Sequence, residues 1–444
     1  MNLKEFTAIA AGKTVLGLTR TLKVGGGSAA PGLYALKIYP DLISKLSRQI
    51  PQTVVITGTN GKTTTARMLA YFATQQGLRV LRNTTGSNLE RGIASALINS
   101  YQADELLRVG RSGPATYDLA VWEVDEAAFN LVLPQIKPDL IIFLNVFRDQ
   151  LDRYGEVDSV VKKWAQTLKH IDPQTTILIN GDDANLLELR SSFRGRIRTF
   201  GVKNYKISGE KTFADKQKTR LDFEAVGVKT IGLQKTSFSI TWDKFSTPAT
   251  LPLPGVYHVY NFLAAFAAAH IMDLPLKPIL KNLPRFSPAF GRVEKLTFKY
   301  AGDRTREGYI FLIKNPAGAT QVFQTIAPEL KKDDRLFLAL NDKLADGTDV
   351  SWIWDTEFEK LKRKVQELKI FVSGSRAEDL ALRLKYAGFD PADITVNRNL
   401  VKSLSSAKRK LSGRLFILPT YTALLELQKI LAKSGVKQHY WKES

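Results

Sequence analysis

Residues 53–65 read Thr-Val-Val-Ile-Thr-Gly-Thr-Asn-Gly-Lys-Thr-Thr-Thr and lead directly into a helix-forming stretch, Ala66–Phe72. The β-branched run predicts a strand, and the glycines predict a tight turn before the helix. Such a corner binds phosphate, because glycines let the backbone approach an anion and the amides at the helix start point toward it. An ordinary corner with a chance lysine is the alternative. The spacing favours an ATP site, in which Lys62 reaches the β- and γ-phosphates and the Thr63 hydroxyl binds Mg²⁺.

The bulk composition is that of a soluble globular protein, with 44% hydrophobic and 24% charged residues in 444. This length predicts two or three domains. No run approaches the roughly 20 apolar residues of a membrane span, and Lys4, Glu5 and Lys13 interrupt any signal-peptide core. The lack of cysteine excludes disulfides, thiolate metal sites and a cysteine nucleophile. A reducing, cytoplasmic location is compatible with this and is expected.

The formal charge of +21 is large for an ATP-binding protein. The densest basic stretches, 360–364 and 408–410, are read first as solvated helix faces. Nucleic-acid binders concentrate basic residues in one module with stacking aromatic side chains, whereas the lysines are spread here. We therefore favour a general attraction to an anionic surface or substrate over a nucleic-acid role, and simple solvation in an unusual cell interior is the third alternative.

The first half of the chain predicts a parallel, helix-covered sheet. Helical spacing over residues 2–23 precedes a glycine-rich break at Gly25–Gly27; the helix either packs on its own domain, which we favour, or lies on a membrane surface. Predicted strands span 53–57, 78–82, 117–124, 139–145 and 176–180. The Lys-, Thr- and Ser-rich stretch 205–250 predicts a small β excursion, and an apolar helix follows at Tyr260–Met272.

A second α/β unit is predicted after a hinge at Leu283–Gly291. Its expected strands are Tyr309–Ile313, Arg335–Leu340, Ile370–Ser373 and Leu415–Leu418. The predicted organisation is an N-terminal helix and linker over 1–50, a central ATP-binding domain over 51–296, and a smaller Rossmann-like α/β domain over 297–444.

The phosphate loop departs from the general G-x-x-x-x-G-K-[ST] pattern, because Ile56 stands where that pattern has its first glycine. The shorter Gly-Thr-Asn-Gly-Lys-Thr form resembles the loop of the Mur ligases and folylpolyglutamate synthases. That resemblance implies a Mur-ligase-like central domain. It also implies a reaction in which ATP turns a carboxylate into an acyl phosphate and an amine displaces the phosphate.

Carboxylates follow the strand expected at 117–124. Glu123 matches the Mg²⁺-binding glutamate of Mur ligases, whereas Asp125 and Glu126 are open to a second interpretation as solvated charges at the strand end. After the next strand, Gln150 stands where many Mur ligases place a histidine that helps to hold a second metal. No lysine is clearly aligned with their carbamoylated lysine, so a second Mg²⁺ site of the usual kind is left open.

Two further segments resemble nucleotide-binding parts of the Mur family. Gly255–Ala265 resembles its G-x-x-N-x-x-N-x-x-A-A helix start: Asn261 is kept, and His258 replaces the first asparagine. A helix-capping or surface histidine is the alternative for His258. The second segment includes Phe290 and Gly291 and resembles the end of the central domain, whose arginine, here Arg292, faces the ATP phosphates.

The C-terminal segments narrow the resemblance to MurT-type subunits of lipid II isoglutaminyl synthase. The resemblance rests on 25–32, 314–318, 341–355, 373–377 and 419–422 and covers nearly the whole chain. It implies that the D-glutamate α-carboxylate of the lipid II stem peptide is phosphorylated. Ammonia from a GatD-type glutaminase partner then yields D-isoglutamine. Lys314, on the facing domain, is expected to join the phosphate site after closure.

The glutaminase in such pairs borrows its third triad member from the synthetase subunit, and Asp349 stands at the matching position. A carboxylate orients the partner's imidazole in that role. The alternatives are that Asp349 caps the turn before Trp352, or that Asp346 or Asp355 has the role instead.

The sequence thus predicts ATP and Mg²⁺ as cofactors, with no structural zinc because no cysteine can form the four-cysteine ribbon of many MurT-type chains. The partners implied are the glutaminase, in a heterodimer, and lipid II or a related muropeptide. A ligase of the same fold that adds an amino acid and a basic ATP-dependent nucleic-acid protein are the rivals. The predicted catalytic residues are Lys62, Lys314 and Asp349; the nucleotide-binding residues are Gly58, Thr59, Asn60, Gly61, Lys62, Thr63, Thr64, Asn261 and Arg292; the metal ligands are Thr63 and Glu123.

Overall fold

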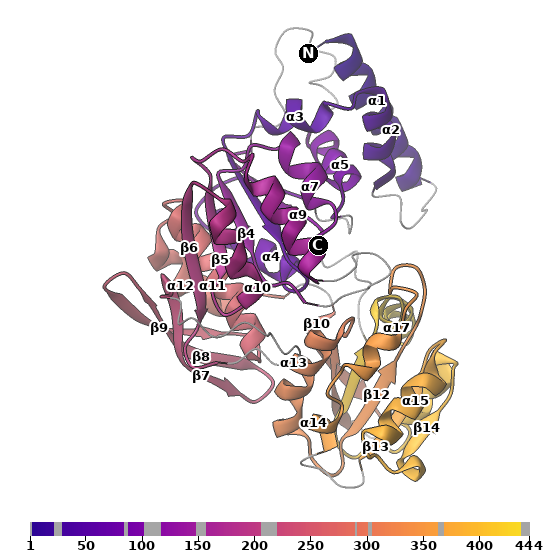
Figure 1. The fold of residues 1–444 in the computed structure, drawn as a ribbon. Helices are drawn as coiled ribbons and strands as arrows, with labels where there is room; N and C mark the ends of the chain where they lie inside the picture. The colour runs from indigo at the N-terminus through magenta and orange to yellow at the C-terminus, as the bar shows by residue number, and fades with distance from the viewer. Residues whose placement is uncertain are drawn as a thin grey trace.

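The computed structural model describes residues 2–21, 29–83, 88–101, 117–147, 157–205, 220–288, 291–300, 304–362 and 368–436. Two sheets form the core of the chain, and helices cover both faces of each (Figure 1). The larger sheet carries the phosphate loop. The smaller sheet lies below it in this view and is built from the last third of the chain.

The larger sheet has nine strands in the order β2-β3-β1-β4-β5-β6-β7-β8-β9. Neighbours from β2 through β7 pair in parallel, and β7, β8 and β9 pair antiparallel. The strands are β1 (Gln52–Thr57), β2 (Val80–Arg82), β3 (Leu119–Glu123), β4 (Leu140–Phe143), β5 (Thr176–Asn180), β6 (Arg196–Val202), β7 (Phe223–Ile231), β8 (Lys235–Trp242) and β9 (Phe245–Leu251). The predicted strands in this half are confirmed. The β excursion extends the main sheet.

Successive side chains of β1 point to opposite faces of the sheet, and the core of this domain accordingly has two layers. Val54 and Ile56 face a layer with α4 (Lys62–Thr74) and α11 (Val256–Ile271). Val55 faces the opposite layer, which contains α5 (Glu90–Ser100), α7 (Phe129–Val132) and α9 (Val157–Leu168). Since β1 lies between β3 and β4 and is buried, the loop that follows it begins between the ends of two neighbouring strands.

Shorter helices complete this half. They are α10 (Ala184–Leu187), α12 (Leu276–Asn282) and the 3₁₀ turns Leu133–Gln135, Glu188–Ser192 and Leu283–Arg285. The apolar helix predicted at Tyr260–Met272 begins earlier, at Val256, because Gly255 takes a backbone φ of 98° that ends the preceding loop.

The N-terminal segment forms α1 (Leu3–Thr21), α2 (Ala30–Ile38) and α3 (Leu42–Ser47). The inner faces of these helices pack on the domain, with Ala8, Ile9 and Ala35 fully buried in the same layer as α5. The expectation that the first helix packs on its own domain is therefore confirmed.

The smaller sheet has six strands in the order β10-β11-β15-β12-β13-β14, and all pairs are parallel except β10 with β11. The strands are β10 (Arg292–Lys299), β11 (Thr305–Phe311), β12 (Arg335–Ala339), β13 (Lys369–Ser373), β14 (Ile394–Val396) and β15 (Leu415–Pro419). Its helices are α13 (Pro316–Ile326), α14 (Glu359–Lys362), α15 (Ala377–Tyr386), α16 (Leu400–Lys408) and α17 (Tyr421–Lys433), with 3₁₀ turns at Ala327–Glu329, Ser351–Trp354 and Pro391–Asp393. The four predicted strands are confirmed, and β10 places the start of this sheet at Arg292, before the domain boundary expected at 297.

Candidate active site

The phosphate loop runs from β1 to the first turn of α4 and depends on two glycines. Gly58 and Gly61 adopt φ values of 136° and 94°, which side-chain-bearing residues rarely take. A Cβ at Gly58 would also lie 2.8 Å from the Asn145 carbonyl oxygen, and one at Gly61 would lie 2.2 Å from Asn261 Oδ1. The loop is thus shaped by backbone conformation and by close packing at the same positions. Asn261, predicted from the α11 motif, lies against it.

Asn60 at the tip of the loop joins three segments of the chain. Its backbone N–H donates to Asn145 Oδ1 at 2.8 Å, and Asn145 Nδ2 donates to the Asn60 carbonyl at 2.9 Å. The Asn60 side-chain amide pairs reciprocally with Asn315 of the C-terminal domain, at 3.1 and 3.0 Å. Asn315 also caps α13 by accepting from the Gly318 N–H. The loop is therefore in direct contact with the smaller domain.

Lys62 is buried and ion-paired. Its ammonium lies 2.8 Å from Glu126 Oε2 and 3.4 Å from Asp125 Oδ1, and it donates to the Gly58 carbonyl. Burial raises the pKa of Glu126, and Lys62 opposes that shift. The interpretation of Glu126 as a solvated strand-end charge is wrong, because this side chain is only 4% exposed and is paired inside the site.

Thr63 and Glu123 form the predicted metal pair. The Thr63 hydroxyl donates to Glu123 Oε2 at 2.7 Å, and Asn83 fixes the Glu123 backbone through hydrogen bonds of 2.8 and 2.9 Å. Burial raises the pKa of Glu123, opposed by the Thr63 hydrogen bond and by Arg82 and Arg292. A hydroxyl and a carboxylate side by side are hard oxygen donors of the kind Mg²⁺ prefers, and a buried carboxylate gains most from a nearby cation. The residues present therefore fit the metal.

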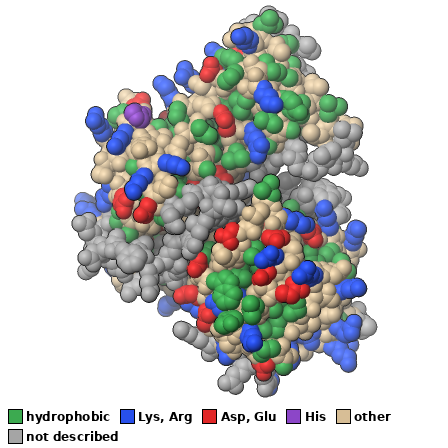
Figure 2. Space-filling model, turned by 45° about the vertical axis from the view of Figure 1, so that its right-hand side comes forward, with side chains coloured by type: hydrophobic (Ala, Val, Ile, Leu, Met, Phe, Trp, Pro, Cys, Tyr) green, Lys and Arg blue, Asp and Glu red, His purple; other side chains and the backbone are tan. Residues whose placement is uncertain are grey.

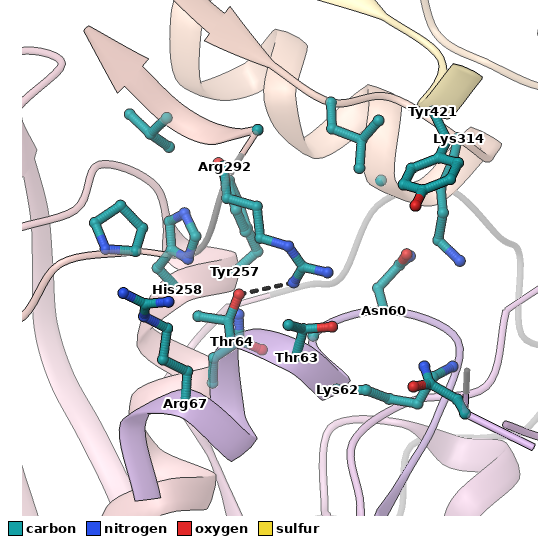
Figure 3. Close-up of a pocket in the computed structure, with 18 of the residues that line it drawn as sticks. Asn60, Lys62, Thr63, Thr64, Arg67, Tyr257, His258, Arg292, Lys314 and Tyr421 are labelled. Carbon is teal, nitrogen blue, oxygen red and sulfur yellow. Dashed lines mark hydrogen bonds between the residues drawn. The ribbon is translucent and has the colours of Figure 1, made fainter. Parts of the chain in front are cut away.

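Arg292 enters the site from the first residue of β10. Its Nη1 donates to Thr64 Oγ1 at 2.7 Å, which joins the smaller sheet to the start of α4 (Figure 3). Burial lowers the pKa of Arg292, and the Glu123 carboxylate opposes that shift. A guanidinium that is partly removed from water is a strong partner for a phosphate, since part of its hydration has already been lost.

A cavity of about 1140 Å³ lies between the loop and the smaller domain. Five basic side chains line it: Lys62, Arg67, Arg82, Arg292 and Lys314. In Figure 3, Lys314 and Tyr421 reach from the C-terminal domain toward Asn60, while Arg67 and His258 lie on the other side of Thr64. The volume and the cationic lining suit a nucleotide triphosphate with part of a second substrate.

His258 lies in the first turn of α11 and is 1% exposed. Neither ring nitrogen has a hydrogen-bond partner among the described residues. Burial, together with Arg292, lowers its pKa to about 3, so the imidazole is neutral at physiological pH. The alternative of a surface or capping histidine is wrong. The ring is a buried polar group that lines the nucleotide cavity, and Tyr257 lies against it with the ring centroids 4.1 Å apart.

Asp349 lies outside the cavity, in the turn before the 3₁₀ helix Ser351–Trp354. It is half-buried and accepts from the Ser351 backbone N–H at 2.7 Å and from the Ser351 hydroxyl at 2.9 Å. The capping geometry given as an alternative is thus present. Asp346 differs, since it is buried, lines the cavity and binds the Thr422 backbone and hydroxyl, whereas Asp355 is exposed.

Several residues of the site were missed by sequence reasoning. Asn145 and Asn83 shape the loop and the Glu123 backbone, and Arg82 adds a cation to the cavity. Asn83 follows one predicted strand and Asn145 ends another, where polar side chains gather in α/β sites, and that position was the available signal. Other residues on which expectations rest lie outside the described residues: Gly25–Gly27, Gln150, Phe290 and part of the 205–250 segment.

Solved structures with the same fold are Mur ligases and their relatives. MurF from Acinetobacter baumannii superposes with a TM-score of 0.67 at 17% identity, over 90% of this chain and 79% of that one. Folylpolyglutamate synthase from Mycobacterium tuberculosis, complexed with ADP and AMPPCP, gives 0.61 at 17% identity over 94% and 93%. A model of the Mur ligase middle domain matches residues 56–269. Fold and site together define an ATP-dependent ligase of the Mur type.

The C-terminal part distinguishes one branch of that class. A model of the MurT ligase C-terminal domain matches residues 312–424. The MurT subunit of lipid II isoglutaminyl synthase from Streptococcus pneumoniae is 30% identical, over 98% of this chain and 99% of that protein. The corresponding subunit from Staphylococcus aureus strain COL is 29% identical over 97% and 99%. The chain belongs to the family of MurT subunits of glutamine-hydrolysing lipid II isoglutaminyl synthase.

Proposed function

We propose that this chain amidates the α-carboxylate of D-glutamate in the stem peptide of lipid II, an intermediate of peptidoglycan synthesis. A carboxylate oxygen attacks the γ-phosphorus of ATP, and ADP leaves. Ammonia then attacks the acyl carbon of the acyl phosphate, loses a proton and expels inorganic phosphate. The product is D-isoglutamine.

The observation that carries this proposal is the convergence of Lys62, the Thr63–Glu123 pair and Arg292 at one end of the cavity. These groups surround the position that the β- and γ-phosphates of a loop-bound nucleotide would take. Charge spreads over the phosphoryl oxygens during transfer, and preorganised cations stabilise that charge. Full-length similarity to MurT subunits supplies the choice of carboxylate.

The chain's own residues have separate tasks in the first step. Lys62 exchanges its carboxylate partners for phosphate oxygens when the nucleotide binds, so Asp125 and Glu126 hold it close to its working position beforehand. Arg292 binds phosphate from the side of the smaller domain. Thr63 and Glu123 would hold Mg²⁺, which supplies charge neutralisation at the phosphates when bound.

The smaller domain completes the phosphate site. Asn315 forms a hydrogen bond with Asn60 of the phosphate loop. Its neighbour in the chain, Lys314, lines the nucleotide cavity. We propose that Lys314 contacts the transferring phosphoryl group or the acyl phosphate after the domains close further. The domain division at about residue 50 and at the start of β10, Arg292, is part of this proposal, with the cavity between the second and third units.

Ammonia would come from a GatD-type glutaminase bound as a heterodimer. Asp349 would then accept a hydrogen bond from the imidazole of the partner's catalytic histidine and complete its triad. Its half-buried position on the C-terminal domain supports this role, because Asp346 is already bound to Thr422 inside the cavity. The work is cytoplasmic in this proposal and peripheral to the inner face of the membrane, where a lipid-linked substrate is exposed.

The test combines purified protein with ATP, Mg²⁺ and either lipid II or its lipid-free muropeptide. Ammonia is supplied directly in one series and as glutamine with the co-purified glutaminase in another. We expect an amidated product, by mass spectrometry, in both series. ATP turnover that requires an added amino acid would contradict the proposal and support the ligase alternative, and turnover stimulated by nucleic acid would support the other rival.

A further inference from the structure

The outer face of the α1–α2 hairpin is unusually apolar. Six of the sixteen large hydrophobic side chains that are exposed in the described residues lie on these two helices, of 19 and 9 residues: Leu3, Phe6, Leu18, Leu33, Tyr34 and Ile38. Leu3 is 82% exposed and Leu18 is 56% exposed. Single exposed leucines are ordinary on a protein surface, but a cluster on neighbouring elements marks an interaction site.

The hairpin cannot turn these side chains inward, because its inner face is fixed to α5. A Cβ on Gly32 would lie 2.0 Å from the Arg91 carbonyl oxygen, so α2 touches the backbone of α5. The Gly32 N–H donates to the Ser95 hydroxyl at 2.8 Å. On α1, Gly12 also packs closely against α5, since a Cβ there would lie 2.8 Å from Ile98 Cδ1. The outer face is therefore a rigid platform.

The charges around this platform are almost all positive. Lys4 and Lys37 are exposed on the hairpin, and Lys45 and Arg48 are exposed on or next to α3. In the described residues up to Ile50, Asp41 is the exposed carboxylate, whereas the Glu5 carboxylate is buried and accepts a hydrogen bond from the Asn2 N–H. Figure 2 shows hydrophobic side chains gathered over the upper end of the molecule, where Figure 1 places α1 and α2, with basic side chains among them.

The platform is connected to the active site by a single helix. α5 begins two residues after Asn88, which lines the cavity and whose carbonyl accepts from the Asp125 N–H. Its 11 residues span about 16 Å. Gly32 lies against its first turn and Gly12 near its last. The helix that holds the platform therefore begins beside the phosphate site, and the distance between the platform and that site is about the length of this short helix.

We propose that the outer face of α1 and α2 binds the headgroup region of an anionic phospholipid bilayer. The apolar side chains would enter the interface and the lysines would pair with lipid phosphates, as in other interfacial helices. Among the described residues, no helix has the length and apolar character to cross a membrane, so the contact is peripheral. The inference rests on the proposed lipid-linked substrate, whose reacting peptide is held near the bilayer.

The test uses the full chain with its glutaminase partner and sedimentation with lipid vesicles. Vesicles of phosphatidylglycerol mixed with phosphatidylcholine should bind the complex, and vesicles of phosphatidylcholine alone should bind it at least about tenfold more weakly. The triple variant Leu3→Gln/Leu18→Gln/Leu33→Gln should lose at least about tenfold in binding to the anionic vesicles. The matched control is Leu131→Gln/Ile231→Gln/Phe245→Gln, which changes three similarly exposed side chains elsewhere and should bind as the wild type does.

A charge variant separates the two contributions. Lys4→Gln/Lys37→Gln should weaken binding to the anionic vesicles and leave the residual binding less sensitive to salt. Circular dichroism and thermal unfolding of each variant should match the wild type, since all the changed side chains are exposed. Equal binding by the triple variant and the wild type would overturn the inference. Dimerisation through the platform would also overturn it. The wild type would then form a dimer that does not bind vesicles, and the triple variant would not form that dimer.

Activity assays keep this inference distinct from the proposed function. The triple variant should amidate a lipid-free muropeptide at the wild-type rate and a vesicle-embedded lipid-linked substrate several-fold more slowly. Absence of amidation on both substrates by the wild type would refute the proposed function while the vesicle result still stands. Normal amidation by a wild type that does not bind vesicles would refute the membrane-binding role of the platform and leave the proposed function standing.

Discussion

The phosphate loop and the Asp349 turn differ in how much of their chemistry the chain supplies itself. Around the loop, Lys62 and Glu123 are buried, Arg292 is half-buried, and all three are paired with other residues of the site. Asp349 is half-buried and accepts hydrogen bonds from the backbone N–H and the hydroxyl of Ser351, two residues further along the chain. In the proposed function this difference corresponds to two tasks: phosphorylation of the carboxylate by this chain, and supply of ammonia by a glutaminase partner.

Of the variants that test this comparison between the phosphate loop and the Asp349 turn, Asp349→Asn should have the largest effect. An asparagine preserves the shape of the turn but removes the charge that would orient and stabilise the partner's imidazole. We expect glutamine-driven amidation to fall on the order of 10³-fold, while ammonia-driven amidation stays within about twofold. Steady-state rates with each nitrogen source measure this. Asp355→Asn, on an exposed neighbour, is the control, and equal loss with both nitrogen sources would show that Asp349 has another role.

Lys62→Met should affect both nitrogen sources alike. Removing the cation at the phosphates is expected to lower kcat with ammonia and with glutamine by about 10²- to 10³-fold. The glutaminase reaction of the partner should continue, which is the opposite of the Asp349 result. Lys45→Met provides an exposed lysine control. Because the substitution leaves Glu126 buried without its cation, thermal unfolding must be measured alongside, and rates are compared below the unfolding range.

Glu123→Gln separates activity from stability. Loss of a carboxylate ligand for Mg²⁺ should lower ATP-dependent amidation by about 10²-fold. Burial raises the pKa of Glu123 in the folded state, so the unfolded chain ionises first as pH rises, and this group destabilises the metal-free fold above the ordinary glutamate range.

In the absence of metal, Glu123→Gln should therefore have a midpoint of thermal unfolding roughly 1 °C higher than that of the wild type at neutral pH. The difference should shrink as pH falls toward that range, where both states bind the proton. Calorimetry at two pH values checks this sign. A lower midpoint for the variant at neutral pH would mean that its hydrogen bond with Thr63 outweighs the cost of burial.

His258→Leu should give the smallest effect. The neutral imidazole offers a donor and an acceptor to the cavity, and an apolar replacement removes both. We expect KM for ATP to rise roughly tenfold with little change in kcat, and His258→Asn to recover part of the loss. His170→Leu on the surface is the control. An unchanged KM would indicate that the ring only fills space.

The sequence predicts most strongly where the chemistry is local. The strand, the turn and Lys62–Thr63 follow one another in the chain, so spacing alone locates them. Glu126 was open to the wrong interpretation because its burial depends on Lys62 and on Trp164, whose indole N–H donates to its carbonyl. Such burial is decided by strand order, which is not local.

The same reason explains the remaining differences. Pairing between strands decides that β7–β9 continue the main sheet and that β10 begins the second sheet, and this pairing is not local in the sequence. Asn315 meets Asn60 only through the arrangement of the two domains. Asp349 came from family resemblance, and the capping bonds of its turn are local enough that sequence also predicted them.

The reciprocal amide pair between Asn60 and Asn315 has a consequence for ionic strength. Amides carry no net charge, so added salt leaves this contact almost unchanged, whereas it weakens the attraction of the basic cavity for a polyanion. Nucleotide affinity and domain contact should therefore respond differently to salt. A cell whose interior becomes saltier would lose ATP occupancy before it lost the alignment of the two halves that use it.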